Sequence, residues 1–284
     1  MLLGDEATLR ARAESLGVTL QGVEFRSPDA EAQARYVKTL LGLRGRRGMT
    51  RYDAEELVRN HGSTVGLLML RQGEADGAVL GLRQSYPETI RMALQLIGLA
   101  PGVRAAAGVH VMISPRGPLF FADTTVNIDP DATMLADIAQ QAARFAQELG
   151  VEPHVAMLSF ANFGASRHPE AVKVAEATRL VRERDPKLDI EGEMQAQIAL
   201  DPASRHNLWP NVGLRGEANV FVFPNLSASN VAYQMLSRLG GVDEIGPILL
   251  GLKRPATVIP PGCGVETIVQ MTAVTALHAQ RGGD

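Results

Sequence analysis

The stretch Val155-Ala-Met-Leu-Ser-Phe-Ala-Asn-Phe-Gly-Ala-Ser-Arg-His-Pro169 begins with apolar residues and continues into a loop of small and polar ones. The apolar run, Val155 to Phe160, has the length and composition of a buried strand. Pro169 favours the first turn of a helix, where its missing N–H costs no hydrogen bond, and the pattern predicts that this helix continues to Arg184. Strand, loop and helix in succession form the unit from which α/β folds are built.

The same alternation runs along the rest of the chain. Helices are predicted at Ala7–Leu16, Pro28–Leu43, Ser85–Ile97, Asp131–Leu149, Ala228–Leu239 and Val265–Gln280, with further helices starting near Thr50 and Met194. Extended segments or strands are predicted at Val18–Phe25, before Gly81, and at Gly108–Ile113, Leu119–Ala122, Leu188–Ile190, Asn219–Phe223 and Ile245–Leu250. This order favours an α/β architecture with a largely parallel sheet.

Two glycine-containing pairs, Pro101-Gly102 and Gly240-Gly241, are the best candidate hinges. They predict a discontinuous first domain, residues 1–101 plus 241–284. Residues 102–240 would then form a second α/β domain inserted into the first.

Composition excludes several classes of protein. The chain has 284 residues, 28 basic and 31 acidic side chains and a formal net charge of −3. With 45% hydrophobic and 21% charged residues it is typical of a soluble globular protein. No apolar stretch reaches the roughly 20 residues of a membrane span, and no secretion signal is recognisable. The sequence has no basic tract of the kind that binds nucleic acid. The single cysteine, Cys263, cannot form an internal disulfide, so a cytoplasmic protein is expected.

The common catalytic and metal-binding motifs are absent from the sequence. It contains no phosphate-binding P-loop, no dinucleotide fingerprint, no zinc-protease motif and no nucleophile elbow. The six histidines share no ligand spacing, so each is expected to be structural or exposed. The acidic stretch from Asp123 to Asp131 lacks the spacing of a calcium loop, and capping of the next helix by Asp129 or Asp131 explains it better. No metal site is expected.

Two segments could bind an anion. The loop from Ser159 to His168 leads into a helix N-terminus, where backbone N–H groups can hold an anion. Arg44, Arg46 and Arg47 form a basic cluster that could bind phosphates. Each segment has an ordinary explanation as well, a strand–loop–helix connection for the first and a solvated loop for the second.

Several motifs, in order along nearly the whole chain, resemble the phosphate acetyl/butyryltransferase family. They begin at Met49, Gly73, Glu88 (Glu-Thr-Ile-Arg-Met-Ala-Leu-Gln-Leu-Ile-Gly), Ala122 (Ala-Asp-Thr-Thr-Val-Asn-Ile-Asp-Pro), Val155, Phe223 (Phe-Pro-Asn-Leu) and Gly246 (Gly-Pro-Ile-Leu-Leu-Gly). Four stretches within the chain are similar to one subgroup, the C-terminal domain of bacterial multidomain NADP-dependent malic enzymes. These stretches begin at Tyr86, Phe121, Ser159 and Glu191.

The resemblance implies a fold of two α/β domains with mostly parallel sheets, similar to isocitrate and isopropylmalate dehydrogenases, with a cleft between the domains. It also implies a homodimer. In the family a strand and a helix precede the position of Met1, so the chain is expected to be a truncated form or a fragment.

Active members of the family let the thiol of coenzyme A attack acetyl phosphate, a step that needs a proton acceptor and groups that stabilise charge. The family provides them in a Ser-Arg-Gly-Cys-x-x-x-Asp stretch. Here Pro260 replaces the serine, Pro261 the arginine and Thr267 the aspartate. Proline has no side-chain donor and threonine is no base at neutral pH, so the resemblance implies no catalytic residues in this chain.

Neighbouring residues offer little replacement. Glu266 is adjacent to the lost acid, but successive residues on a helix point about 100° apart. Cys263 has no neighbour in sequence that would lower the pKa of its thiol.

Other family positions are retained and imply a site for acetyl-CoA and its anionic groups. The matching residues are Arg44, Arg91, Ser159, Asn162, Gly164, Ser166, Ser229 and Asn230. A retained cleft without its base is what a ligand sensor requires.

Three functions follow as hypotheses. The first is an acetyl-CoA-binding, non-catalytic regulatory domain that mediates feedback inhibition of an NADP-dependent malic enzyme, which oxidatively decarboxylates malate to pyruvate. This chain would need no cofactor, and NADP and a divalent metal would be bound by the catalytic domain, its partner in the longer protein. The second is an active phosphate acetyltransferase, and the third a purely structural dimerisation module.

Overall fold

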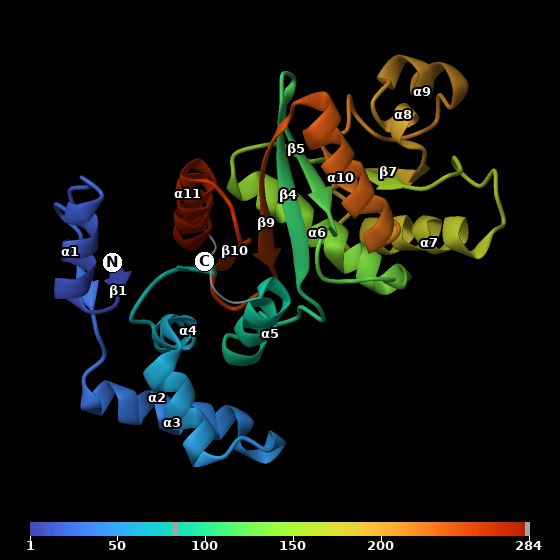
Figure 1. Cartoon of the computed structure of the whole chain (residues 1–284). Helices are drawn as coiled ribbons and strands as arrows, with labels where there is room; N and C mark the ends of the chain where they lie inside the picture. Colours follow the sequence, from blue (N-terminus) through green and yellow to red (C-terminus); the bar gives the residue numbers. More distant parts are fainter. Residues whose placement is uncertain (82–84, 282–284) are drawn as a thin grey trace.

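The computed structural model describes residues 1–81 and 85–281, and its chain folds into alternating helices and strands (Figure 1). The strands are β1 (Leu2–Leu3), β2 (Phe25–Arg26), β3 (Ala78–Gly81), β4 (Ala107–Ser114), β5 (Gly117–Ala122), β6 (His154–Leu158), β7 (Asp189–Met194), β8 (Val220–Val222), β9 (Asp243–Leu250) and β10 (Ala256–Ile259). The helices are α1 (Glu6–Ser15), α2 (Ala30–Arg44), α3 (Arg51–Asn60), α4 (Gly62–Gln72), α5 (Tyr86–Leu96), α6 (Ala132–Glu148), α7 (Pro169–Arg184), α8 (Ala196–Ala199), α9 (Pro202–Leu208), α10 (Leu226–Gly240) and α11 (Val265–Arg281), with a short 3₁₀ turn η1 (Gly45–Arg47).

A six-stranded sheet with the order β7-β6-β8-β5-β4-β9 dominates the structure. Its pairs are parallel from β7 to β5, whereas β4 is antiparallel to both β5 and β9. Two small parallel pairs, β1 with β2 and β10 with β3, complete the strands. The predicted α/β fold with mostly parallel sheets is therefore confirmed.

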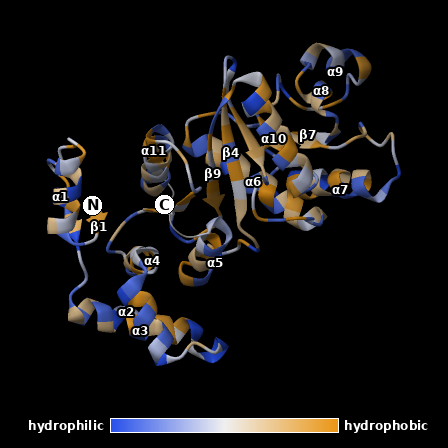
Figure 2. Ribbon diagram, in the orientation of Figure 1, coloured by the Kyte–Doolittle hydropathy of each residue, from blue (hydrophilic) through white to orange (hydrophobic). Residues whose placement is uncertain are grey.

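Helices cover both faces of this sheet, as expected when both faces of its strands are apolar (Figures 1 and 2). On one face α6, α7 and α11 pack against the sheet around Phe120, Phe145 and Val155. On the other face α8 and α10 pack around Phe121 and Phe221. The two faces have separate hydrophobic clusters.

A third cluster lies outside the large sheet, where α2 to α5 pack around the β3–β10 pair. Tyr36 and Leu40 of α2 are buried there with the apolar turns of α4, such as Leu67 and Leu68. The N-terminal arm, β1 to β2, lies at the edge of the molecule away from the six-stranded sheet (Figure 1). Of the arm, Leu3 packs against this cluster.

Helix caps account for most of the predicted boundaries. Asp131 caps α6 with a hydrogen bond from Met134 N, and Thr50 forms a capping box with Asp53 at α3. Pro169 occupies the first position of α7 as predicted. Ser85 precedes α5 as predicted, but its side chain makes no capping hydrogen bond.

Several elements differ from the prediction. The segment from Val18 to Phe25 is mostly loop, because Gly17 and Gly22 adopt left-handed conformations that interrupt a strand. The helix expected from Met194 is instead the end of β7 followed by the short α8 and α9, the second starting at Pro202. The helix α4 and the strands β1 and β10 were not predicted.

β9 links the two proposed domains. It belongs to the segment assigned to the first domain, residues 241–284, yet it pairs along its length with β4 of the second. The division at 101/102 and 240/241 therefore stays a prediction. Among the described residues, no helix is long and apolar enough to cross a membrane.

We predict that Phe145→Ala destabilises the fold strongly. The side chain is 1% exposed and meets the Phe120 ring edge-on with centroids 6.0 Å apart. Its loss leaves a cavity and should lower the free energy of unfolding by about 3–5 kcal/mol in a denaturant titration. Phe160→Ala is the matched control, since Phe160 is 57% exposed and should change stability little. Equal effects of the two changes would contradict this description of the core.

Candidate functional site

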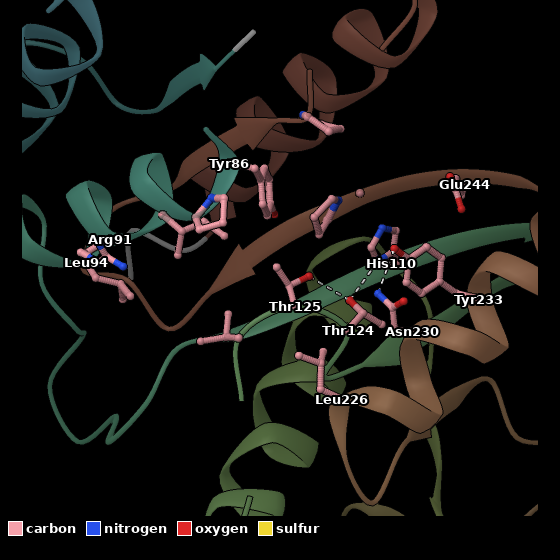
Figure 3. A pocket seen from close by; sticks show the side chains of 16 residues that line it. Tyr86, Arg91, Leu94, His110, Thr124, Thr125, Leu226, Asn230, Tyr233 and Glu244 are labelled. Atoms are coloured by element: carbon pink, nitrogen blue, oxygen red, sulfur yellow. Dashed lines mark hydrogen bonds between the residues drawn. The ribbon is translucent and has the colours of Figure 1, made fainter. Parts of the chain in front are cut away.

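A cavity of about 740 Å³ lies where α5, β4, β9, α10 and the loop after β5 meet (Figure 3). It is lined by Tyr86, Pro87, Ile90, Arg91, Leu94, His110, Thr124, Thr125, Val126, Leu226, Asn230, Tyr233, Glu244, Gly246, Pro247 and Pro260. Its volume and mixed apolar and polar walls are typical of small-molecule sites.

The carboxylate of Asp123 holds one wall of the cavity. It accepts backbone N–H bonds from Gly108 at 2.9 Å, Thr125 at 2.8 Å and Val126 at 3.1 Å. Asn127 adds a backbone bond at 2.9 Å and a side-chain bond to the same carboxylate. The Asp123 side chain is buried, so these bonds are formed away from water and fix the loop that carries the cavity residues Thr124 to Val126.

The predicted polar pair on α10 divides into two roles. Ser229 is fully buried, and its single hydroxyl proton is shared between the carbonyl oxygens of Asp123 at 2.5 Å and Leu226 at 2.9 Å. Asn230 lines the cavity, with its amide 3.5 Å from the hydroxyl of Tyr233. Ser229 thus ties α10 to the Asp123 loop, and Asn230 faces the space where a ligand would lie.

The two predicted arginines meet at a smaller cavity beside the first. Arg91 lines both the large cavity and a neighbouring one of about 180 Å³, which Arg44 also lines. Arg44 ends α2 and Arg91 lies on α5, and both residues line this cavity together with Glu88. Arginine is suited to binding anions, and the role of these two residues in an anion site stays a prediction.

The predicted anion loop lies elsewhere. Of Ser159, Asn162, Gly164 and Ser166, none is among the residues that line the large cavity. Three of these residues form hydrogen bonds with the end of β7 and the residue after it: Ser159 N with Met194 O, Asn162 with Gln195, and Gly164 N with Glu193 Oε1. The fourth, Ser166, accepts a hydrogen bond at Oγ from His168 N within the loop. Their contact with a ligand stays a prediction.

The replaced catalytic stretch reaches the cavity at one residue. Pro260 forms part of the wall, directly after β10. Thr267 lines a separate cavity of about 330 Å³, together with Glu266 and Glu244. Glu244 lines both cavities.

Sequence reasoning missed His110, which is 3% exposed and lines the large cavity. Its ring stacks on Tyr233 with centroids 4.0 Å apart and planes at 16°, and its Nδ1 lies 2.8 Å from Thr124 Oγ1 (Figure 3). Burial lowers the pKa of His110 to about 4, so the imidazole is neutral at physiological pH. Burial also raises the pKa of Tyr86 well above its usual value, so its phenol stays protonated. The only sign of His110 in the sequence was a histidine within a predicted apolar strand.

The described part of the chain contains no cluster of side chains suited to a metal site. Across residues 1–81 and 85–281, no cluster of three or more histidine, cysteine, aspartate or glutamate side chains could hold a metal ion. The cavity can therefore offer hydrogen bonds, apolar contacts and the charges of Arg91 and Glu244.

Comparison with known proteins yields two groups of relatives. The profile of the family described as phosphate acetyl/butaryl transferase matches residues 1–276. The chain is 37% identical to the NADP-dependent malic enzyme of Haemophilus influenzae, covering 99% of this chain and 38% of that protein. It is 35% identical to the phosphate acetyltransferase of Bacillus subtilis, covering 98% and 86%. The structure of the EutD phosphotransacetylase from Staphylococcus aureus superposes with a TM-score of 0.89, at 35% identity over 98% of this chain and 86% of that one.

We predict that His110 makes stability depend on pH. Its pKa is about 4 in the folded chain against an ordinary 6.5, so the unfolded chain binds the proton more readily. The free energy of unfolding should fall by about 3 kcal/mol as pH drops from above 6.5 to 4, and His110 should add no change below 4. Denaturant titrations of the wild type and His110→Gln should show this extra slope only in the wild type, and parallel curves would contradict it.

Proposed function

Because the chain belongs to the phosphate acetyl/butaryl transferase family, we propose that its large cavity binds acetyl-CoA without transferring the acetyl group. We propose further that this binding regulates an NADP-dependent malic enzyme, in which the chain serves as a feedback-inhibition domain.

The observation that carries the proposal is the position of Pro260. The family's serine would stand at this place in the cavity wall, and the arginine and aspartate that accompany it are Pro261 and Thr267 here. Proline offers neither a side-chain donor nor an N–H, and losing a general base alone costs about 10²–10⁴ in rate. A ligand can still bind here, but its thiol meets no base supplied by this stretch.

The retained features suit a phosphate-bearing ligand with a long arm. Arg44 and Arg91 can pair with anionic groups, and apolar residues such as Ile90, Leu94 and Leu226 can pack against the arm. Binding acts as regulation if acetyl-CoA prefers one state of the longer protein, and a coupling of about 1–3 kcal/mol is enough.

Malic enzymes among the relatives support this choice of parent protein. The chain spans only 38% of the Haemophilus enzyme, so malate oxidation would be carried out by another part of the longer protein. NADP and a divalent metal would be bound there, and that part would be the regulatory partner of this chain. Homodimer formation and a cytoplasmic location belong to the same proposal.

An active phosphate acetyltransferase is the competing candidate, favoured by the 35% identity to the Bacillus enzyme over 86% of its length. It would need another base. Glu266 lines the cavity of about 330 Å³ that Thr267 also lines, and not the large cavity, which argues against Glu266 as that base. A purely structural dimerisation module would not need the retained arginines.

We predict that the purified chain binds acetyl-CoA in calorimetry and that Arg91→Ala weakens binding about 10- to 100-fold, as expected for a lost charged hydrogen bond. Arg59→Ala is the matched control, because Arg59 is exposed on α3 and pairs only with Glu56 among the described residues. Absence of binding at millimolar acetyl-CoA would refute the proposal. Equal affinities of both variants would refute the placement of the ligand.

A further inference from the structure

His110 is held in one orientation by three neighbours. Between Val109 and Val111 the pairing of β4 with β9 shifts, so Gly246 and Pro247 of β9 oppose the single residue His110. Such a bulge re-aims side chains near binding sites. A Cβ at Gly246 would lie 2.8 Å from His110 Cδ2, so only glycine lets the strand approach the ring this closely. Tyr233 stacks on the ring, and Thr124 holds Nδ1.

The hydrogen bonds of Thr124 assign the tautomer. Its hydroxyl donates to the Gly108 carbonyl at 3.1 Å, and a carbonyl can only accept. We place the single hydroxyl proton on this bond, so that Oγ1 accepts from His110 and Nδ1 carries the imidazole proton. Nε2 is then a bare acceptor. Within the described residues no hydrogen bond reaches Nε2, although the ring lines the cavity.

A second acceptor lies nearby on the same face of the sheet. Glu244 pairs with Met112, two residues along β4 from His110, and lines the same cavity. In the part of the chain that the structure describes, its Oε2 is buried without a hydrogen-bond partner. Arg91, by contrast, lies at the other end of the cavity (Figure 3). The cavity thus has a cationic end at Arg91 and, at the other end, two acceptors, His110 Nε2 and Glu244 Oε2, that have no donor among the described residues.

We propose that His110 Nε2 accepts a hydrogen bond from an amide N–H of a pantetheine arm and so makes the cavity selective for that arm rather than for the nucleotide alone. The inference rests on the proposed function, because acetyl-CoA supplies the arm. An arm of this kind carries two amide N–H groups and no charge, which suits a neutral imidazole. Anionic groups of the same ligand would lie toward Arg91, since the acceptor end repels them.

Calorimetry with three ligands tests the proposal. Acetyl-CoA and CoA carry the arm, and adenosine 3′,5′-bisphosphate carries phosphates without it. His110→Phe keeps a ring but removes Nε2, and it should weaken acetyl-CoA and CoA equally, by about tenfold, while leaving the bisphosphate unchanged. His110→Gln restores an acceptor and should bind acetyl-CoA within about threefold of the wild type.

Gly246→Ala is a second test, because it keeps the imidazole of His110 but displaces it, and it should produce the same loss confined to the arm. His206→Phe is the matched control on the exposed part of α9 and should alter no affinity.

The contrary outcomes are distinct. Unchanged acetyl-CoA affinity in His110→Phe, an equal loss for the bisphosphate, or a loss confined to CoA would each overturn the role of His110. In all three the proposed function stands. Absence of acetyl-CoA binding by the wild type overturns the proposed function and this inference with it.

Discussion

The carboxylate of Asp123, buried and bonded to four residues, is the interaction on which the cavity depends. One bond ties it to Gly108 of β4, and the others fold the loop after β5 into a compact turn. Its carbonyl oxygen also accepts from Ser229, which fastens α10 to the same point. A buried charge is tolerated only when it is fully hydrogen-bonded, so this arrangement admits little variation. The wall from Thr124 to Val126 and the inner face of α10 therefore keep fixed positions around the cavity.

The groups that this scaffold surrounds differ from those of the family's catalytic stretch. Arg91 supplies a positive charge at one end, His110 is neutral because it is buried, and the phenol of Tyr86 is protonated. Pro260 stands in the wall where the family pattern has a serine. We propose that this cavity holds an acyl-CoA by its phosphates and its arm while leaving the thioester unreacted. Binding energy that is not used in catalysis remains available to favour one conformation of a larger protein.

Local signals in the sequence were sufficient for most of the fold. The proline at the start of α7 and the cap of α6 depend on neighbouring residues, and both were predictable. β10 was missed because a four-residue apolar segment next to prolines is a weak signal, and its partner β3 is far away in the chain.

The site was predictable only in part, because some of its residues depend on contacts with residues far away in the chain. Arg91, Asn230 and Pro260 were identified through the family pattern, and they do line one cavity. His110 owes its role to Gly246 and Tyr233, which are distant in sequence, so no spacing could reveal it. Ser229 is used inside the fold, which its sequence neighbours do not indicate.

The central claim is that the cavity binds without catalysing, and the most direct measurement is the rate of acetyl-CoA formation from CoA and acetyl phosphate by the purified chain. We expect no thioester above the uncatalysed background. Steady turnover that disappears when Arg91 is replaced by alanine would contradict the account, because it would place an acyl transfer in this same cavity.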